Sequence, residues 1–289
     1  MKSPRLFMFF ILLLFLNCPR IISLDDFLFD PVAVDEYLRP EDLAEWGTRF
    51  IIPDSLIEAV ELTSLGNRIY GFFVKGHPDS VVNNGVTILY FEGKDENINR
   101  YWVRVEYFWE MGFNVFIFDY QGYGRSEGTP SGDALFSDGH EALMYVKSRT
   151  DIDTAKIVFY GFSLGTFVTT YVAAEVAHPA ATIIEAAPAS ATALLRDSGL
   201  LNLTGSYVVD ADFDNEKRIA SIGSPLFMIH SRDDDFVVFD RHAPLIWDKA
   251  VQPKEHLWID DADHDGIQEV LGLAYNNAVI GFIRHFVID

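Results

Sequence analysis

Residues 157–174 read IVFYGFSLGTFVTTYVAA and give the clearest indication of how this chain folds. The apolar run at 157–160 fits a short strand, and the residues after 165 fit the start of an apolar helix. Between them, GFSLG at 161–165 places a serine at a sharp turn, and its two glycines let strand and helix approach the strained serine backbone. A hydroxyl on such a turn projects above the edge of a sheet. Ser163 is therefore the candidate nucleophile.

The same G-x-S-x-G pattern occurs a second time, as GRSEG at 124–128. Here a loop sequence, QGY, precedes the pattern, and a threonine and a proline follow it at 129–130. These residues cannot open a helix in register, so this copy lacks the strand–turn–helix context that the chemistry needs. We therefore expect Ser126 to be a loop residue.

Short apolar runs alternate with amphipathic stretches from about residue 57 onward. The expected strands are 57–63, 69–74, 86–91, 115–120, 157–160, 181–185, 226–230 and 256–259. The expected helices are 98–111, 132–147, 164–176, 240–250 and 267–286. The turn sequence SLGN joins the first two strands into an antiparallel hairpin, and the later alternation implies parallel strands with crossover helices. The predicted fold class is α/β, with a mostly parallel central sheet of about eight strands and helices on both faces.

The segments outside this pattern suggest three further regions. The core domain is expected over 55–289, with a small lid formed by the insertion at 187–224. Residues 18–54 contain four prolines and are expected to form an irregular leader that wraps the domain or links it to a membrane. Residues 1–17 are expected to be a signal peptide.

The N-terminus carries two cations and then an unbroken apolar run of 11 residues at 6–16. A membrane-spanning helix needs about 20 apolar residues, so this run fits the core of a signal peptide. The only cysteine, Cys18, follows at once, in an arrangement that resembles a bacterial lipoprotein signal with a lipidated cysteine. Lipidation, an uncleaved anchor and a cleaved secretory peptide remain alternatives. The protein is expected to be exported, to the bacterial cell envelope or beyond it.

Composition excludes several classes of protein. Hydrophobic residues make up 49% of the chain, too many for a disordered protein. The 43 acidic residues outnumber the 22 Lys and Arg, giving a net charge of −21 that argues against nucleic acid as a partner. One cysteine cannot form an intrachain disulfide or a Cys-based zinc site. We expect no metal and no cofactor.

An acid and a base should follow the serine at the ends of later strands. The strand at 226–230 is followed by three consecutive carboxylates at 233–235, and one of them must orient an imidazole. Four histidines come later, of which His264 lies in the loop right after the strand at 256–259. The other three, His242, His256 and His285, are expected to be structural. Because a general base works only when neutral, activity should fall on the acid side.

Four ordered blocks, at 87–93, 118–126, 161–165 and 229–237, resemble the alpha/beta-hydrolase fold superfamily. Within it, the chain resembles the abhydrolase-domain group that is often labelled serine aminopeptidase-like. The register of the last block selects Asp234 as the acid. The resemblance also implies an oxyanion hole formed by the backbone N–H groups of Leu164 and Lys94. The first of these donors follows as well from the helix N-terminus after the turn.

One departure from the family concerns Glu92, which replaces the usual histidine. If ionised, this carboxylate would oppose a developing oxyanion. Alternatively it points away and pairs with Lys94 or Arg125.

The expected function is that of a serine hydrolase, with Ser163 attacking a carbonyl, His264 moving the proton and Asp234 orienting His264. Esters, thioesters and amides of a small-molecule or lipid-like acyl substrate are compatible, and an esterase or a lipase is favoured over a peptidase. Membrane contact is expected only through the N-terminus. The alternative is a catalytically silent, surface-anchored binding protein on the same scaffold. A dehalogenase or an epoxide hydrolase would need a carboxylate at position 163.

Overall fold

The computed structural model describes residues 21–23, 25–38, 42–43, 47–49, 51–77, 85–198, 206–208 and 212–289. The expected signal peptide at 1–17 and Cys18 lie outside the described residues, so export and lipidation stay predictions. Within the described ranges, none of the helices combines the length and the apolar character that crossing a membrane requires.

The centre of the molecule is an eight-stranded sheet with the order β12-β11-β9-β8-β5-β7-β4-β3. Its strands are β3 (Ile57–Ser64), β4 (Asn67–Val74), β5 (Thr87–Phe91), β7 (Asn114–Phe118), β8 (Ile157–Phe162), β9 (Ala181–Glu185), β11 (Leu226–Ser231) and β12 (Lys254–Ile259). Strand β3 pairs antiparallel with β4, and β4 pairs antiparallel with β7. All other pairs are parallel. The predicted fold class is confirmed.

The sequence explains why the sheet forms in this way. Strands β5, β8 and β9 are buried along their whole length, as uninterrupted apolar runs require when both faces of a sheet are covered. The hairpin between β3 and β4 turns at Leu65 and Gly66, which have φ values of +50° and +85°. Glycine adopts such a φ without steric cost.

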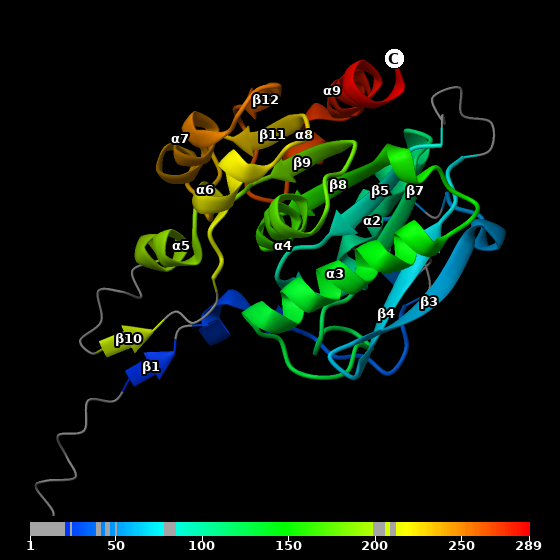
Figure 1. Cartoon of the computed structure of the whole chain (residues 1–289), viewed down its shortest axis with the longest axis horizontal. Coiled ribbons are helices and arrows are strands. Elements are labelled where there is room, and N and C mark those ends of the chain that lie inside the picture. Colours follow the sequence, from blue (N-terminus) through cyan, green and yellow to red (C-terminus); the bar gives the residue numbers. More distant parts are fainter. Residues whose placement is uncertain are drawn as a thin grey trace, which may run out of the picture.

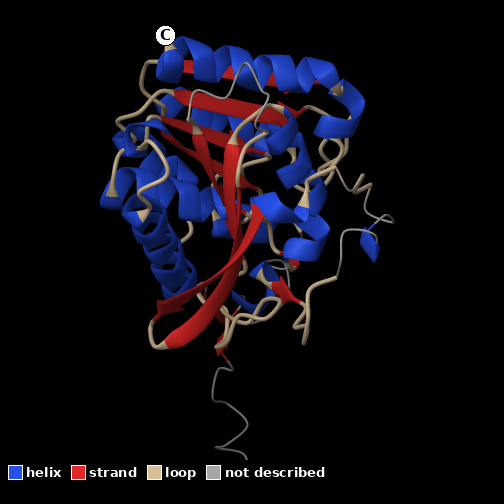
Figure 2. Cartoon of the chain, turned by 90° about the vertical axis from the view of Figure 1, so that its right-hand side faces the viewer, coloured by secondary structure: helices blue, strands red, loops and turns tan. Residues whose placement is uncertain are grey.

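Helices cover both faces of the sheet, as Figure 2 shows. The main helices are α2 (Ile98–Glu110), α3 (Gly132–Ser148), α4 (Gly165–Tyr171), α5 (Ala191–Asp197), α6 (Asn215–Arg218), α7 (Phe239–Lys249), α8 (Ile267–Leu271) and α9 (Leu273–Ile283). Two π-helical turns continue α4 and α9, namely η5 (Val172–Val176) and η8 (Arg284–Ile288). The 3₁₀ turns among the described residues include η1 (Asp25–Leu28), η3 (Asp54–Leu56), η4 (Thr154–Lys156) and η7 (Ile219–Ser221). One hydrophobic cluster joins the sheet to α3 and α4, and a second joins it to α2 and α9.

The expected continuous helix over 267–286 is wrong. The structure divides it into α8 and α9 at Gly272, whose φ of +50° is outside the helical region. The apolar periodicity continues across this break, so the pattern alone did not reveal it.

Two small parallel pairs lie outside the central sheet. Strand β1 (Ile21–Ser23) pairs with β10 (Ser206–Val208), and Figure 1 shows this pair apart from the main sheet. Strand β2 (Asp30–Pro31) pairs with β6 (Asp95–Glu96). The insertion at 187–224 therefore contains a strand that was not expected there, because three residues are too few to form a recognisable apolar run. The division into leader, core domain and lid stays a prediction.

Candidate active site

Ser163 occupies the turn between β8 and α4, with a φ of +51°. Its N–H donates to the carbonyl oxygen of Glu185 on the neighbouring strand β9, at 3.0 Å. A Cβ at Gly165 would lie 2.1 Å from the carbonyl oxygen of Phe91, and a Cβ at Gly161 would lie 2.2 Å from the Thr169 hydroxyl. Only glycine leaves room for strand and helix to meet at this serine.

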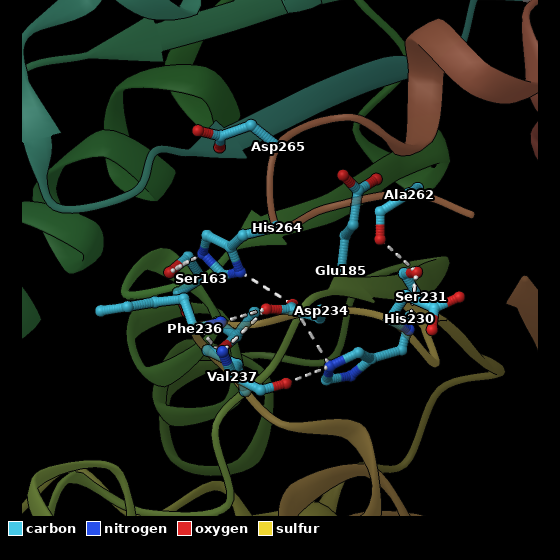
Figure 3. Close-up of polar contacts among 12 residues, drawn as sticks. Ser163, Glu185, His230, Ser231, Asp234, Phe236, Val237, Ala262, His264 and Asp265 are labelled. Carbon is cyan, nitrogen blue, oxygen red and sulfur yellow. Dashed lines mark hydrogen bonds and ion pairs between the residues drawn. The ribbon is translucent and has the colours of Figure 1, made fainter. Parts of the chain in front are cut away.

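The structure brings together the three side chains that the sequence analysis selected. His264, in the loop after β12, has its Nε2 2.9 Å from the Ser163 Oγ. Its Nδ1 lies 2.8 Å from the Oδ2 of Asp234, in the loop after β11 (Figure 3). The carboxyl ends of β8, β11 and β12 meet at one edge of the sheet, so residues 101 positions apart in the chain become neighbours.

Asp234 is held by its own loop. Its Oδ1 accepts hydrogen bonds from the N–H groups of Phe236, at 3.0 Å, and Val237, at 2.8 Å. Of the two neighbouring carboxylates, Asp233 accepts from the N–H of Asp261 at 2.8 Å, and Asp235 is exposed. The loop geometry therefore singles out the middle carboxylate of the three.

His230 is a supporting residue that the sequence analysis did not assign. It is buried at the end of β11, and its Nε2 lies 2.8 Å from the carbonyl oxygen of Val237 and 3.5 Å from the Oδ2 of Asp234. Burial acts to raise the pKa of Asp234, but hydrogen bonds from His230 and His264 outweigh it and hold that pKa well below its usual range. Asp234 is therefore ionised at neutral pH.

The remaining three histidines make other contacts. His242 is buried in α7 and accepts from the N–H of Ala189 at its Nδ1, at 3.1 Å, and desolvation lowers its pKa. His256 stacks on Trp258 with ring centroids 4.7 Å apart. His285 is exposed near the end of the chain.

A cavity of about 250 Å³ opens onto Ser163 and His264. It is also lined by Lys94, Asp95, Tyr101, Phe162, Phe236 and Asp265. Lys94 lies three residues after the end of β5, and its ammonium lies 5.2 Å from the centroid of the Phe236 ring. Leu164 is the N-cap residue of α4, next to Ser163. Of the two residues expected to form an oxyanion hole, Leu164 thus directly follows the serine and Lys94 lines the same cavity.

Comparisons with known proteins bear on the fold of the chain. Residues 83–206 match the family model described as serine aminopeptidase, S33. The solved structure of a Pyrococcus furiosus esterase, Pf2001, superposes with a TM-score of 0.69 over 90% of this chain and 98% of that one, at 18% identity. The chain resembles the family of that model over residues 83–206 and has the fold of alpha/beta hydrolases. The resemblance stated from the sequence is thus confirmed, and hydrolase activity is supported.

Similar proteins of known sequence match most of the length of this chain. It is 29% identical over 270 residues to the uncharacterized protein YfhR of Escherichia coli O157:H7, covering 89% of each chain. It is 27% identical over 235 residues to the human alpha/beta hydrolase domain-containing protein 17B, covering 80% of this chain and 77% of that one. The family model ends before Asp234 and His264, so it includes only the serine of the three hydrogen-bonded residues.

Glu92 behaves differently from both alternatives that the sequence left open. It is fully buried beside Asp119 and is not paired with Lys94 or Arg125. Arg125 lies instead over the Tyr70 ring, 4.6 Å from its centroid. Burial, reinforced by the Asp119 carboxylate, raises the pKa of Glu92 well above its usual range. A protonated Glu92 can donate to Asp119 and carries no charge beside the serine.

The sequence analysis also did not predict a buried ion pair near Ser163. The Arg104 guanidinium of α2 lies 2.7 Å from the Glu185 carboxylate at the end of β9 and 3.8 Å from the centroid of the Phe162 ring. It also reaches the carbonyl oxygen of Asp265, at 3.4 Å. The available signal was Glu185 itself, a charged residue at the end of an otherwise apolar strand. Among the described residues, no cluster of His, Cys, Asp and Glu suits a metal ion.

Proposed function

We propose that this protein is a serine hydrolase that cleaves a carboxylic ester through Ser163, His264 and Asp234. The observation that carries the proposal is the continuous hydrogen-bonded chain from the Asp234 carboxylate through both His264 nitrogens to the Ser163 Oγ. That chain ends at a cavity large enough for a small acyl group. Ionised Asp234 fixes the proton of His264 on Nδ1, so that Nε2 faces the serine as an acceptor.

The reaction has two halves. In the first, His264 Nε2 takes the hydroxyl proton as Ser163 Oγ attacks the carbonyl carbon, and it then gives that proton to the departing alcohol oxygen. The product of this half is an acyl-enzyme at Ser163. In the second, a water molecule gives a proton to His264, attacks the acyl carbon and releases the acid, and the proton returns to Ser163.

The tetrahedral intermediate of each half carries a negative oxygen. We assign its stabilisation to the backbone N–H groups of Leu164 and Lys94, and donors of this kind typically lower a barrier by about 3 kcal/mol each. A neutral Glu92 does not oppose that charge, which removes the main objection raised by the sequence.

An ester is preferred over an amide because solved structures of similar fold include esterases from Pyrococcus furiosus and Rhodothermus marinus. These likenesses, at 18% and 20% identity, establish the fold alone, so the preference belongs to the proposal. Thioesters and amides would use the same residues.

The test is covalent labelling of the folded protein with a fluorophosphonate probe. We expect wild-type protein and the Ser126→Ala variant to be labelled, and the Ser163→Ala variant to remain unlabelled. Hydrolysis of p-nitrophenyl acetate should follow the same pattern. A wild-type protein that is folded but takes no label would exclude the hydrolase and leave the catalytically silent binding protein.

A further inference from the structure

A second cavity, of about 200 Å³, lies beside the catalytic one. Lys94 and Phe236 line both cavities, so the second adjoins the space in front of Ser163. Its apolar walls come from three separate parts of the chain, namely Phe27 and Leu28 before β2, Leu194 and Leu195 in α5, and Phe236 and Val238 after β11.

The walls of this cavity are held in place by backbone hydrogen bonds. The N–H of Asp30 donates to the carbonyl oxygen of Lys94 at 3.2 Å, and the N–H of Val32 donates to that of Glu96 at 3.0 Å. The leader is thereby fixed against the segment that carries Lys94. Helix α5 begins with a side-chain cap, because the Ser190 hydroxyl accepts from the N–H of Ala193 at 3.1 Å. The cavity is therefore formed before any ligand arrives.

Two of the three charged residues at this cavity are paired or exposed, and the third, Lys94, is half-buried with its ammonium over the Phe236 ring. Asp197 is paired with Arg241 at 2.9 Å and lies 3.1 Å from the Nε2 of His242. Asp235 is exposed to solvent. A hydrocarbon chain entering the cavity would thus contact mainly apolar side chains, with Lys94 among the residues that the two cavities share.

A third cavity that adjoins the catalytic one is lined mainly by charged and polar residues. Tyr101 and Asp265 line both, and the third cavity, of about 530 Å³, has a lining that also includes Arg100, Arg104 and Glu269. A hydrocarbon chain placed there would lie against the paired guanidinium groups of Arg100 and Arg104 and against Glu269, rather than against mainly apolar side chains. The apolar cavity is thus the favoured site for such a chain.

Resting on the hydrolase function proposed above, we propose that the cavity between the leader and α5 binds an unbranched hydrocarbon chain of the ester substrate. The chain belongs to either the acyl half or the alcohol half of the ester, and the two sources are separable by experiment. Leader residues Phe27 and Leu28 are then part of the substrate site, although they lie far outside the residues that match the family model.

The first test measures kcat/KM for two ester series. One series lengthens the acyl group of p-nitrophenyl esters from acetate to octanoate, and the other lengthens the alcohol of alkyl acetates from ethyl to octyl. Each buried methylene should raise kcat/KM about fourfold until the cavity is full. A rise in the acyl series assigns the cavity to the acyl half, and a rise in the alcohol series assigns it to the alcohol half. A rise in neither would overturn the proposal.

A pair of matched variants tests the location. Leu194, half-buried in α5, lines the cavity, and Leu194→Trp should reduce the gain from acetate to octanoate (or from ethyl to octyl) at least tenfold. Leu245→Trp is the control, because Leu245 is 44% exposed on α7 and lines neither cavity. Equal effects of the two substitutions would place the chain elsewhere.

Binding without turnover separates this proposal from the hydrolase itself. Calorimetry with the Ser163→Ala variant should detect octanoate or 1-octanol, and Leu194→Trp added to that variant should weaken binding at least tenfold. If neither compound binds, the cavity is not a chain site, even for an active enzyme. If binding occurs but wild-type protein takes no fluorophosphonate label, the chain site stands and the hydrolase fails.

Discussion

The two G-x-S-x-G turns of this chain show what the motif does and does not specify. Both serines are buried, with exposed fractions of 5% for Ser163 and 7% for Ser126. The Ser126 hydroxyl donates to the carbonyl oxygen of Asp119 at 2.8 Å and accepts from the N–H of Tyr70 at 2.9 Å. The Ser163 hydroxyl instead lies within hydrogen-bond distance of the His264 imidazole. One hydroxyl is committed to the backbone, and the other is available for chemistry.

The backbone explains this difference. At the first turn the serine itself adopts a positive φ between a strand and a helix. At the second, Gly124 and Gly128 adopt the positive φ values, +51° and +89°. The N–H of Ser126 donates to Tyr123 within the loop, at 2.8 Å. The motif alone therefore does not select a nucleophile, whereas its position at the end of a parallel strand does.

The largest predicted contrast comes from replacing each serine by alanine. Ser163→Ala should lower kcat for p-nitrophenyl acetate by about 10⁴-fold or more, because the attacking oxygen is gone, and should leave the free energy of unfolding nearly unchanged. Ser126→Ala should retain most of the activity but lose about 1–3 kcal/mol of stability, since two buried backbone groups lose their partner. Urea unfolding and steady-state kinetics measure both. A reversed pattern would mean that the two turns were assigned the wrong way round.

Replacing the base should have an effect nearly as large. His264→Ala should reduce kcat by about 10⁴-fold, because a serine hydroxyl is a weak nucleophile without a base. His242→Ala is the matched control, since His242 contacts the backbone of Ala189 rather than Ser163. It should cost stability by leaving that N–H unpaired and should keep most of the activity. Activity retained by His264→Ala would move the base to another residue.

Local features of the sequence predicted the sheet, Ser163 and His264, whereas the family resemblance was needed to choose Asp234 among three carboxylates. Ser163 and His264 each follow a short apolar run, and such runs mark buried strands whatever the rest of the chain does. The environment of Glu92 could not be predicted from the sequence, because it depends on burial in the folded protein and on Asp119, which follows strand β7. Arg104 was missed for the same reason, since its partner Glu185 is 81 residues away in the chain.

A smaller effect, on stability, is expected from the glycines of the two turns. Gly165→Ala would push a Cβ to 2.1 Å from the Phe91 carbonyl oxygen and 2.4 Å from that of Glu92, so α4 must move away from β5. We expect a loss of about 3 kcal/mol together with a fall in activity. Gly128→Ala meets only the amide ends of Gln121 and Asn67, which can shift, and strain from its φ of +89° should cost about 1–2 kcal/mol. Thermal unfolding of both variants tests the order, and an equal loss would remove the close-packing argument for Gly165.

The smallest predicted effect on activity comes from replacing Glu92, which lies beside Asp119. Ser126 holds the backbone of Asp119, and the carboxylate of Asp119 accepts from the N–H of Ile98, at 2.8 Å, and from the hydroxyl of Tyr37. Desolvation raises the pKa of Asp119 to about 7, and that of Glu92 is raised further above its usual range. Folded protein thus retains a proton on Glu92 that the unfolded chain releases above about pH 4.3.

Because the folded state binds the extra proton, stability must fall as pH rises through this range. Above about pH 7, where Asp119 has also ionised in the folded state, the remaining slope belongs to Glu92, at about 1.4 kcal/mol per pH unit. Glu92→Gln has no proton to release, so above about pH 7 its free energy of unfolding should fall less steeply with rising pH than that of wild-type protein. Its activity at pH 7 should stay within about threefold of wild type, since the amide can still donate to Asp119 and is equally neutral. Urea titrations at three pH values measure the free energy of unfolding of both proteins. If it changes with pH equally in wild type and Glu92→Gln, Glu92 is ionised in the folded protein and its charge does act on the oxyanion.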